Sequence, residues 1–217
     1  MIIIVDYGMG NLRSVSKAVE ALGAEARVTS DPGEVAKAPQ LILPGVGAFG
    51  AAMRELTARG LIEPIKAAIA SGTPYLGLCL GLQLLFDSSE ESPDVAGLGV
   101  LPGAVKRFPH SATGFKVPHM GWNQVMSPQP TAHSAQPTAE PTPRRCPLLN
   151  GIPEGSFFYF VHSYYAEPSE PSVVAGETEH GLRFAAMVWR ERLFATQFHP
   201  EKSQAAGLRL LQNFISL

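Results

Sequence analysis

The sequence predicts an α/β fold: a three-layer sandwich with a mostly parallel central sheet, plus a smaller antiparallel β element in the second half. Two observations lead to this prediction. In the first half, short apolar runs of buried-strand type alternate with stretches of helical spacing, which is typical of a parallel sheet covered on both faces. Later, short strand-like runs follow one another without long helices between them, which favours antiparallel pairing.

The expected elements follow this division. Strands are expected at residues 2–5, 26–29, 41–43, 75–78, 98–100, 104–108, 122–125, 157–161, 173–175, 184–189 and 193–198. Helices are expected after Asn11, which could cap the first of them, and at about 50–59, 61–71, 80–86 and 203–216. Because the carboxyl ends of parallel strands meet at one edge, the glycine-bearing loops at 8–10, 45–50 and 77–81 are expected there together.

Length and composition narrow the class of protein. The 217 residues predict a single domain, 1–217, and a net charge of −2 gives no electrostatic case for binding nucleic acid. Two cysteines predict no disulfide framework and favour a reducing, cytoplasmic location. The start of the chain lacks the basic leader of a signal peptide, and no apolar run reaches the roughly 20 residues of a membrane span.

Cys79 stands at the sharpest expected turn of the chain. It lies between a buried-strand run and an apolar helix, and Gly77 and Gly81 flank it. Glycines permit a tight strand-to-helix turn that projects the middle side chain, and the positive end of the helix favours a thiolate. A buried, inert cysteine is the alternative interpretation.

A second stretch, residues 194–203, supplies partners for a nucleophilic cysteine. His199 and Glu201 follow an apolar run, and residues two apart in extended chain face the same side. A thiol nucleophile needs a base, and the base needs a group that orients it. Cys79, His199 and Glu201 offer these three roles, so the sequence predicts that they meet in space.

Two glycine-bearing loops could bind ligands. Residues 44–50 contain three glycines within six positions, and their open amides could bind an anion or a developing oxyanion; a flexible connector is the alternative. The glycines at 8 and 10 are only weak evidence for a dinucleotide site, because Arg13 stands where the motif G-x-G-x-x-G has its third glycine. No metal site and no cofactor are predicted.

Two stretches differ from the rest in polarity. Residues 127–147 are rich in Pro, Thr, Ala, Ser and Gln, so we expect a mobile surface loop in which Cys146 has no chemical role. Residues 116–123 mix aromatic, cationic and amide groups and are too polar for a core position. They are expected to form a surface hairpin or a binding surface.

The motif GLCLGLQ at residues 77–83, combined with HPE at 199–201, resembles the class I glutamine amidotransferases. PGVG at 44–47 is similar to the oxyanion loop of those enzymes. The resemblance covers essentially the whole chain, with 127–147 as an insertion relative to the family pattern. It implies a flavodoxin-like sandwich as the fold.

Three further stretches narrow the resemblance. Residues 6–12, 118–123 and 160–164 resemble one branch of the family, the glutaminase subunits of imidazole glycerol phosphate synthases. This implies hydrolysis of glutamine to glutamate and ammonia by the three residues singled out above. It also implies oxyanion donors at Val46, Gly47 and Leu80, and substrate contacts at Gly47, Gln83, Ser163 and Tyr164.

The resemblance further implies a partner. Ammonia in neutral water is mostly ammonium, which is no nucleophile, so it must pass directly to an acceptor. The implied partner is a cyclase subunit of (β/α)8-barrel type, bound as a heterodimer, which uses the ammonia to make imidazole glycerol phosphate and aminoimidazole carboxamide ribotide. The candidate interface residues are Asn11, His119, Trp122, Asn123 and Lys202.

Three alternatives stay open at this point. The chain could serve another class I pathway, such as pyridoxal phosphate synthesis, although residues 118–123 and 160–164 argue against it. It could be a cysteine hydrolase or peptidase that acts alone. It could also be a flavodoxin-like binding module with an idle cysteine, which a glutamine-like chloroketone would fail to label at Cys79.

Overall fold

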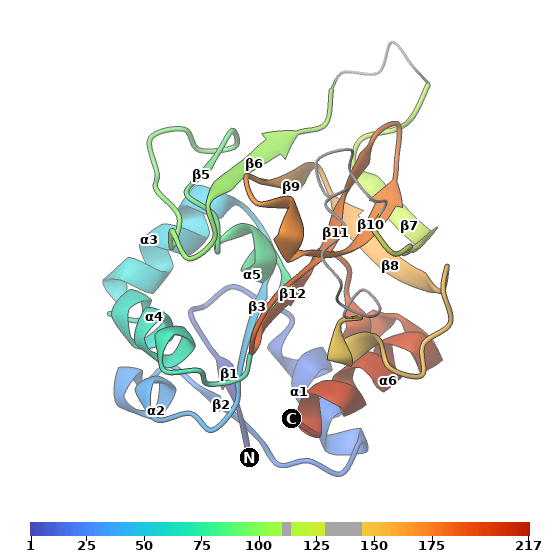
Figure 1. The fold of residues 1–217 in the computed structure, drawn as a ribbon. Helices are drawn as coiled ribbons and strands as arrows, with labels where there is room; N and C mark the ends of the chain where they lie inside the picture. Colours follow the sequence, from blue (N-terminus) through green and yellow to red (C-terminus); the bar gives the residue numbers. More distant parts are fainter. Residues whose placement is uncertain (110–113, 129–144) are drawn as a thin grey trace, which may run out of the picture.

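The structure, a computed structural model, describes residues 1–109, 114–128 and 145–217. Its centre is a ten-stranded sheet with helices on both faces, and a two-stranded antiparallel sheet lies beside it (Figure 1). This is the predicted three-layer α/β arrangement with a smaller antiparallel element. Among the described residues, no helix is both long and apolar enough to cross a membrane.

The elements have the following bounds. The strands are β1 (Ile2–Val5), β2 (Ala26–Thr29), β3 (Leu41–Gly45), β4 (Tyr75–Cys79), β5 (Ser88–Ser89), β6 (Gly103–Arg107), β7 (His119–Gln124), β8 (Phe157–His162), β9 (Tyr164–Pro168), β10 (Val174–Glu179), β11 (Arg183–Arg190) and β12 (Leu193–Thr196). The helices are α1 (Leu12–Ala21), α2 (Pro32–Ala36), α3 (Phe49–Ala58), α4 (Ile62–Ala70), α5 (Leu80–Gln83) and α6 (Gln204–Ile215). Short 3₁₀ turns are η1 (Pro147–Leu149), η2 (Pro171–Val173) and η3 (Pro200–Lys202).

The order of strands brings distant parts of the chain to one edge of the sheet. That order is β2-β1-β3-β4-β12-β11-β9-β6-β5, with β10 beside β11. The first five are parallel, so their carboxyl ends meet. In the register of β4 and β12, Leu78 lies opposite Thr196. The next residues, Cys79 and Gln197, therefore emerge at the same edge.

Two apolar layers separate the sheet from its helices. Neighbouring residues of β1 point to opposite faces, so Ile3 packs with residues of α2, α3 and α4, whereas Ile4 packs with residues of α1 and α6. Figure 1 shows the same division of helices between the two faces. Burial on both faces explains why these strands are continuous apolar runs in the sequence.

Two predicted elements differ in the structure. The helix expected at 80–86 ends at Gln83, because the following turn tightens and the amide of Leu85 bonds only three residues back. Residues 98–100 form no strand, since the amide of Val100 bonds to the carbonyl of Leu85. This segment satisfies the carbonyl groups at the end of the helix instead of joining the sheet.

Three short elements, α2, β5 and β9, are not predicted by the periodicity. The start of α2 depends on local chemistry, because the Asp31 side chain accepts hydrogen bonds from the amides of Gly33 and Glu34. The helix α1 begins differently from the prediction. Asn11 occupies its N-cap position, but the Asn11 side chain makes no capping hydrogen bond.

The Pro-rich segment 127–147 is described only at its ends. The hydroxyl of Ser127 donates to the Glu154 carboxylate (2.8 Å), and Cys146 is 2% exposed among the apolar residues on the α6 side. The prediction of a surface position is therefore wrong for Cys146, because it enters the core together with Leu148, two residues later. Burial raises the pKa of the Cys146 thiol to about 12. The rest of the predicted loop lies outside the described residues.

Candidate active site

Cys79 lies at the junction of β4 and α5, in a backbone conformation that most residues avoid. Its φ is 54° and its ψ is −105°. Two glycines allow the turn to close: a Cβ on Gly77 would lie 2.6 Å from the carbonyl oxygen of Gly81, and one on Gly81 would lie 2.0 Å from that of Leu43. The predicted strand-to-helix turn is present, and the sulfur lies beside the first turn of α5.

His199 reaches the same edge from the far end of the chain. It follows β12, the neighbour of β4, and precedes the turn η3. Its amide donates to the carbonyl of Tyr159 (2.9 Å), and its carbonyl accepts from the hydroxyl of Ser203 (2.6 Å). The backbone of His199 is therefore held on both sides.

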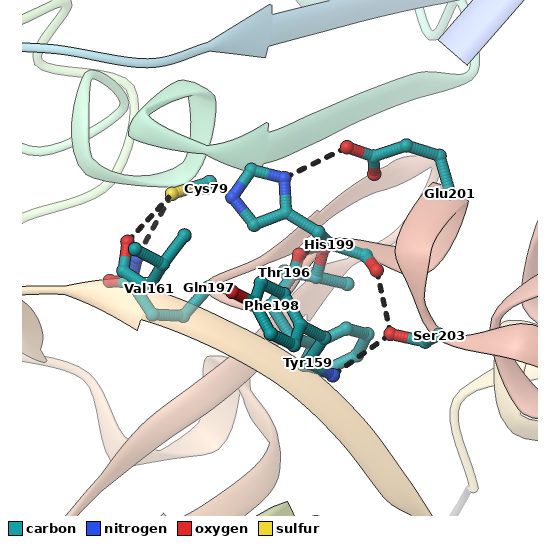
Figure 2. Close-up of polar contacts among 9 residues, drawn as sticks. All are labelled: Cys79, Tyr159, Val161, Thr196, Gln197, Phe198, His199, Glu201 and Ser203. Atoms are coloured by element: carbon teal, nitrogen blue, oxygen red, sulfur yellow. Dashed lines mark hydrogen bonds and ion pairs between the residues drawn. The ribbon is translucent and has the colours of Figure 1, made fainter. Parts of the chain in front are cut away.

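The imidazole of His199 lies between a carboxylate and a thiol (Figure 2). Its Nδ1 is 2.9 Å from Oε1 of Glu201, and the two side chains are only 3% and 1% exposed. Its Nε2 faces the sulfur of Cys79, and no oxygen or nitrogen of the described residues bonds to it. Burial alone lowers the pKa of His199, but its interactions with Cys79 and Glu201 outweigh burial and raise that pKa to about 10. The site therefore favours an imidazolium.

Two further groups contact the sulfur of Cys79. The side-chain amide of Gln197 donates to it from 3.7 Å, and the carbonyl of Val161 lies 4.0 Å away (Figure 2). No motif predicts either residue; the one sequence signal for Gln197 is its position two residues before His199.

A cavity of about 440 Å³ opens over the sulfur. Its lining brings together the residues predicted for the nucleophile, the base, the oxyanion loop and the substrate contacts: Val46, Gly47, Cys79, Leu80, Gln83, Ser163, Tyr164 and His199. Gly47 has a φ of +94°, a backbone conformation that L side chains rarely adopt. The turn at position 47 therefore favours a glycine, whatever role the predicted oxyanion loop has.

Gln83 is part of the cavity wall, although it is only 5% exposed. Its amide nitrogen donates to the carbonyl of Tyr164 (2.9 Å) and to Oε1 of Gln197 (3.1 Å). Both amide protons of Gln83 are thus used inside the protein. The side-chain oxygen remains able to accept a hydrogen bond from a ligand.

Glu91 also lines the cavity, and the sequence analysis did not identify it. Its carboxylate accepts a hydrogen bond from the amide of Phe49 (2.7 Å), the first residue of α3 after the predicted oxyanion loop. The hydroxyl of Ser92 accepts one from the amide of Gly50 (3.2 Å). The segment that carries both acceptors has no periodic pattern, so only the folded chain reveals this contact.

The residues predicted for a partner interface differ in exposure. Trp122 is 46% exposed, and the ammonium of Lys202 lies over the ring of Tyr159 at the surface, 5.8 Å from its centre. Asn11 and Asn123 are half-buried. These four positions remain candidates for contact with a partner.

His119 does not fit that prediction. It is 4% exposed and stacks on the ring of Phe160 (4.7 Å between centres) and on that of His180 (4.2 Å). Its side chain leaves β7 on the inner face, opposite to that of Trp122. The prediction of direct contact between His119 and a partner is therefore wrong for this structure.

Fold and site together define an α/β protein with a cysteine at a strand-to-helix turn, facing a buried histidine–carboxylate pair. The family model "Glutamine amidotransferase class-I" matches residues 3–217, and the chain belongs to this family. It is 54% identical to "Imidazole glycerol phosphate synthase subunit HisH" of Moorella thermoacetica, over 98% of this chain and 93% of that protein. Proteins of the same name from Syntrophotalea carbinolica and Rhodopirellula baltica are 51% and 54% identical, over 99% of this chain and 98% and 96% of theirs.

Solved structures share the fold at low sequence identity. A crystal structure of a glutamine amidotransferase superposes with a TM-score of 0.72 at 19% identity, and the match covers 100% of both chains. The structure of PurLQS from Thermotoga maritima gives a TM-score of 0.68 at 19% identity, over 99% of this chain and 97% of that one. These similarities bear on the fold alone.

Proposed function

We propose that this chain is the glutaminase subunit of an imidazole glycerol phosphate synthase and hydrolyses glutamine to glutamate and ammonia in histidine biosynthesis. The observation that carries the activity is the arrangement of Cys79, His199 and Glu201: a thiol on a strained turn, an imidazole facing it, and a buried carboxylate on the other ring nitrogen. Acyl transfer through cysteine needs a nucleophile, a proton carrier and a group that orients the carrier.

Acylation starts from the Cys79 thiolate and the His199 imidazolium. The sulfur attacks the side-chain amide carbon of glutamine, and the carbonyl electron pair moves to the oxygen. His199 Nε2 gives its proton to the nitrogen as the carbon–nitrogen bond breaks, so ammonia leaves and a thioester remains. Glu201 stays bonded to Nδ1 and stabilises the positive charge that the ring carries before transfer.

Hydrolysis of the thioester restores the site. The neutral imidazole of His199 takes a proton from water, whose oxygen adds to the thioester carbon. The tetrahedral intermediate then expels the Cys79 thiolate and releases glutamate. The imidazolium and thiolate of the starting state are re-formed, so no net proton stays on the enzyme.

Both tetrahedral intermediates carry an oxyanion that needs fixed donors. We assign this role to the amide of Leu80 and to an amide of Val46 or Gly47, which border the cavity beside the sulfur. Backbone amides suit this role because they need no reorganisation during the reaction. The hydrogen bond between Glu91 and Phe49 supports this loop from the α3 side.

The polar groups of the cavity match the charges of a glutamine molecule. Glu91 is the one carboxylate among the described residues that line it, and it is suited to bind the α-ammonium group. Gln83, Ser163 and Tyr164 offer polar groups for the rest of the substrate. The side-chain amide is then left to reach Cys79.

An apolar face beside the cavity supports a protein partner. Met120 and Trp122 of β7 are 63% and 46% exposed, and Phe157 of β8 is 54% exposed. Their cross-strand neighbours on this face are Val161, Tyr159 and Gln124. Exposed aromatic and methionine side chains are enriched in interfaces. Because Val161 also lines the cavity, this face suits the (β/α)8-barrel cyclase, which would take up ammonia directly as a heterodimer.

Replacement of the nucleophile tests this proposal. In the complex with its cyclase, Cys79→Ala should lower glutamine-dependent synthesis by roughly a thousandfold or more, because no other nucleophile of the described residues faces His199. Synthesis from added ammonia should persist, because the cyclase site is untouched. Steady-state assays with glutamine and with ammonium salts measure both activities.

Cys146→Ala is the matched control, since it removes the second, buried thiol. It should retain glutamine-dependent synthesis if it folds. Glutaminase activity in Cys79→Ala would exclude the proposed mechanism. Stimulation of glutamine hydrolysis by an unrelated synthase, and not by the cyclase, would exclude the proposed pathway.

A further inference from the structure

A row of hydrogen bonds leads inward from strand β7. The side-chain nitrogen of Asn123 lies 3.2 Å from Nε2 of His119, and Nδ1 of His119 lies 2.9 Å from Nε2 of His162. Nδ1 of His162 lies 2.8 Å from the carbonyl oxygen of Tyr164. These contacts connect the half-buried Asn123, on the inner face of β7, to the wall of the active-site cavity.

The hydrogen bonds of this row all run the same way, from donor to acceptor, toward the carbonyl of Tyr164. The carbonyl of Tyr164 can only accept, so Nδ1 of His162 must donate to it. Burial lowers the pKa of His162 to about 3 and that of His119 to about 4, so each ring carries a single proton at neutral pH. Nε2 of His162 then accepts from Nδ1 of His119, and Nε2 of His119 accepts from the amide of Asn123. Every donor in the row finds an acceptor.

The row continues from Tyr164 to the nucleophile. The same carbonyl accepts a second hydrogen bond, from the amide of Gln83 (2.9 Å). That amide also donates to Oε1 of Gln197 (3.1 Å), and Gln197 in turn donates to the sulfur of Cys79 (3.7 Å). Gln83 and Gln197 are 5% and 0% exposed, so water cannot replace these contacts. The amide oxygen of Gln197 is occupied by Gln83, which turns its nitrogen toward the sulfur.

We propose that these side chains form a positioning relay that aims the amide of Gln197 at the Cys79 sulfur and couples its orientation to strand β7. The members of this relay are Asn123, His119, His162, Gln83 and Gln197, with the carbonyl of Tyr164 as their junction. The relay connects the inner face of β7 to the nucleophile, and the opposite face of the same strand carries Met120 and Trp122 of the proposed partner face. The inference rests on the proposed function for the role of Cys79, but its tests require no turnover.

The first test determines which ring nitrogen carries the proton in His119 and in His162. In the free protein at neutral pH, two-bond ¹H–¹⁵N NMR correlations should show His119 and His162 as neutral rings protonated on Nδ1. The Nε2-protonated tautomer is the usual form of free imidazole, so this result would not arise by default. His119→Phe assigns the resonances. A charged ring or an Nε2 proton on either histidine would overturn the relay.

The second test measures how fast the sulfur of Cys79 reacts. Alkylation of Cys79 by iodoacetamide, followed by peptide mass spectrometry, reports its thiolate without glutamine or cyclase. Gln197→Met keeps the length of the side chain and removes the donor, so it should slow alkylation about fivefold near pH 7. His119→Phe, four hydrogen bonds farther along the relay, should slow alkylation as well, by about twofold or more.

His180→Phe is the matched control for His119→Phe. His180 stacks on His119, but its Nε2 bonds to the carbonyl of Lys116 (2.7 Å), outside the relay. It should leave the alkylation profile unchanged, whereas a purely structural role predicts equal effects of the two variants. Equal profiles would overturn the relay even if glutaminase activity is normal. Conversely, absence of glutaminase activity in the wild-type complex with normal Nδ1 tautomers would reject the function alone.

Discussion

Two groups of buried histidines in this protein show opposite behaviour. His199 is 2% exposed and His162 is 7% exposed, so both have lost nearly all contact with water. The pKa of His199 nevertheless rises to about 10, whereas that of His162 falls to about 3. Burial is therefore not what separates them.

The difference lies in their hydrogen-bond partners. His199 has the carboxylate of Glu201 on Nδ1 and the sulfur of Cys79 before Nε2, and both groups favour a charged ring. His162 has a backbone carbonyl on one side and the neutral ring of His119 on the other, which cannot offset the cost of a buried charge. The first environment suits proton transfer, and the second suits a fixed, uncharged hydrogen-bond network.

Removal of the Glu201 carboxylate should produce the largest change in the difference between the pKa values of His199 and His162. Glu201→Gln retains an oxygen that can accept from Nδ1 but removes the charge, so we expect the pKa of His199 to fall well below 10. The rate of glutamine hydrolysis should fall about ten-thousandfold, in line with the same carboxylate-to-amide change in other triads. NMR titration of His199 and steady-state kinetics measure these two effects.

Glu63→Gln is a suitable control, because Glu63 is exposed in the first turn of α4 and distant in sequence from the site. It should change neither the pKa of His199 nor the rate of glutamine hydrolysis. An unaltered His199 pKa in Glu201→Gln would mean that the carboxylate is not the source of the shift, and the contrast between the two groups would lose its explanation.

Mild acid should act on the neutral histidines and leave His199 unaffected. His119 and His162 have folded-state pKa values of about 4 and 3, below the usual value of about 6.5 for an unfolded chain. Below pH 6.5 the two histidines bind protons in the unfolded state but not in the folded state, so the free energy of unfolding falls as pH falls. Each histidine should cost roughly 2 kcal/mol at about pH 5.

His199 adds nothing to this loss: near pH 6.5 its raised pKa opposes it slightly, because the folded state already holds the proton that the unfolded state is still taking up, and well below pH 6.5 the ring is protonated in both states. Urea unfolding near pH 7 and near pH 5 measures the loss. In His119→Phe the loss should be smaller by roughly 2 kcal/mol, because one of the two rings is gone. The same loss in the variant and the wild type would show that His119 is not held neutral by the fold.

The sequence predicts these two regions unequally. The alternation of apolar runs predicts the parallel sheet, because buried strands and amphipathic helices have distinct periodicities. The turn at Cys79 is equally local, since Gly77 and Gly81 are needed within four positions for close backbone approach. The pair His199 and Glu201 is a short motif as well. Chemistry that depends on neighbours in sequence can therefore be predicted from it.

The histidine network could not be predicted in this way. His119, His162 and Gln197 come from three different strands or strand ends, and they meet only through the pairing of β7 with β8 and of β12 with β4. A single histidine in a polar stretch gives no sign of the direction in which it points. For that reason His119 is predicted at the partner surface, whereas the pleat of β7 turns it inward.

The smallest expected effect concerns a carboxylate that lies in the same cavity but does not contact His199. Glu91→Gln keeps an acceptor for the amide of Phe49 and removes the charge opposite the proposed α-ammonium group. We expect KM for glutamine to rise about tenfold with little change in kcat, because the contact is the same in the ground and transition states. The pH profile governed by His199 should stay as in the wild type.

Glu90→Gln is the control, since Glu90 bonds to Arg107 and Lys106 at the surface. A fall in kcat at constant KM would instead place Glu91 with Glu201 among the groups that act on the reacting atoms, and charge alone would then no longer distinguish the two sites.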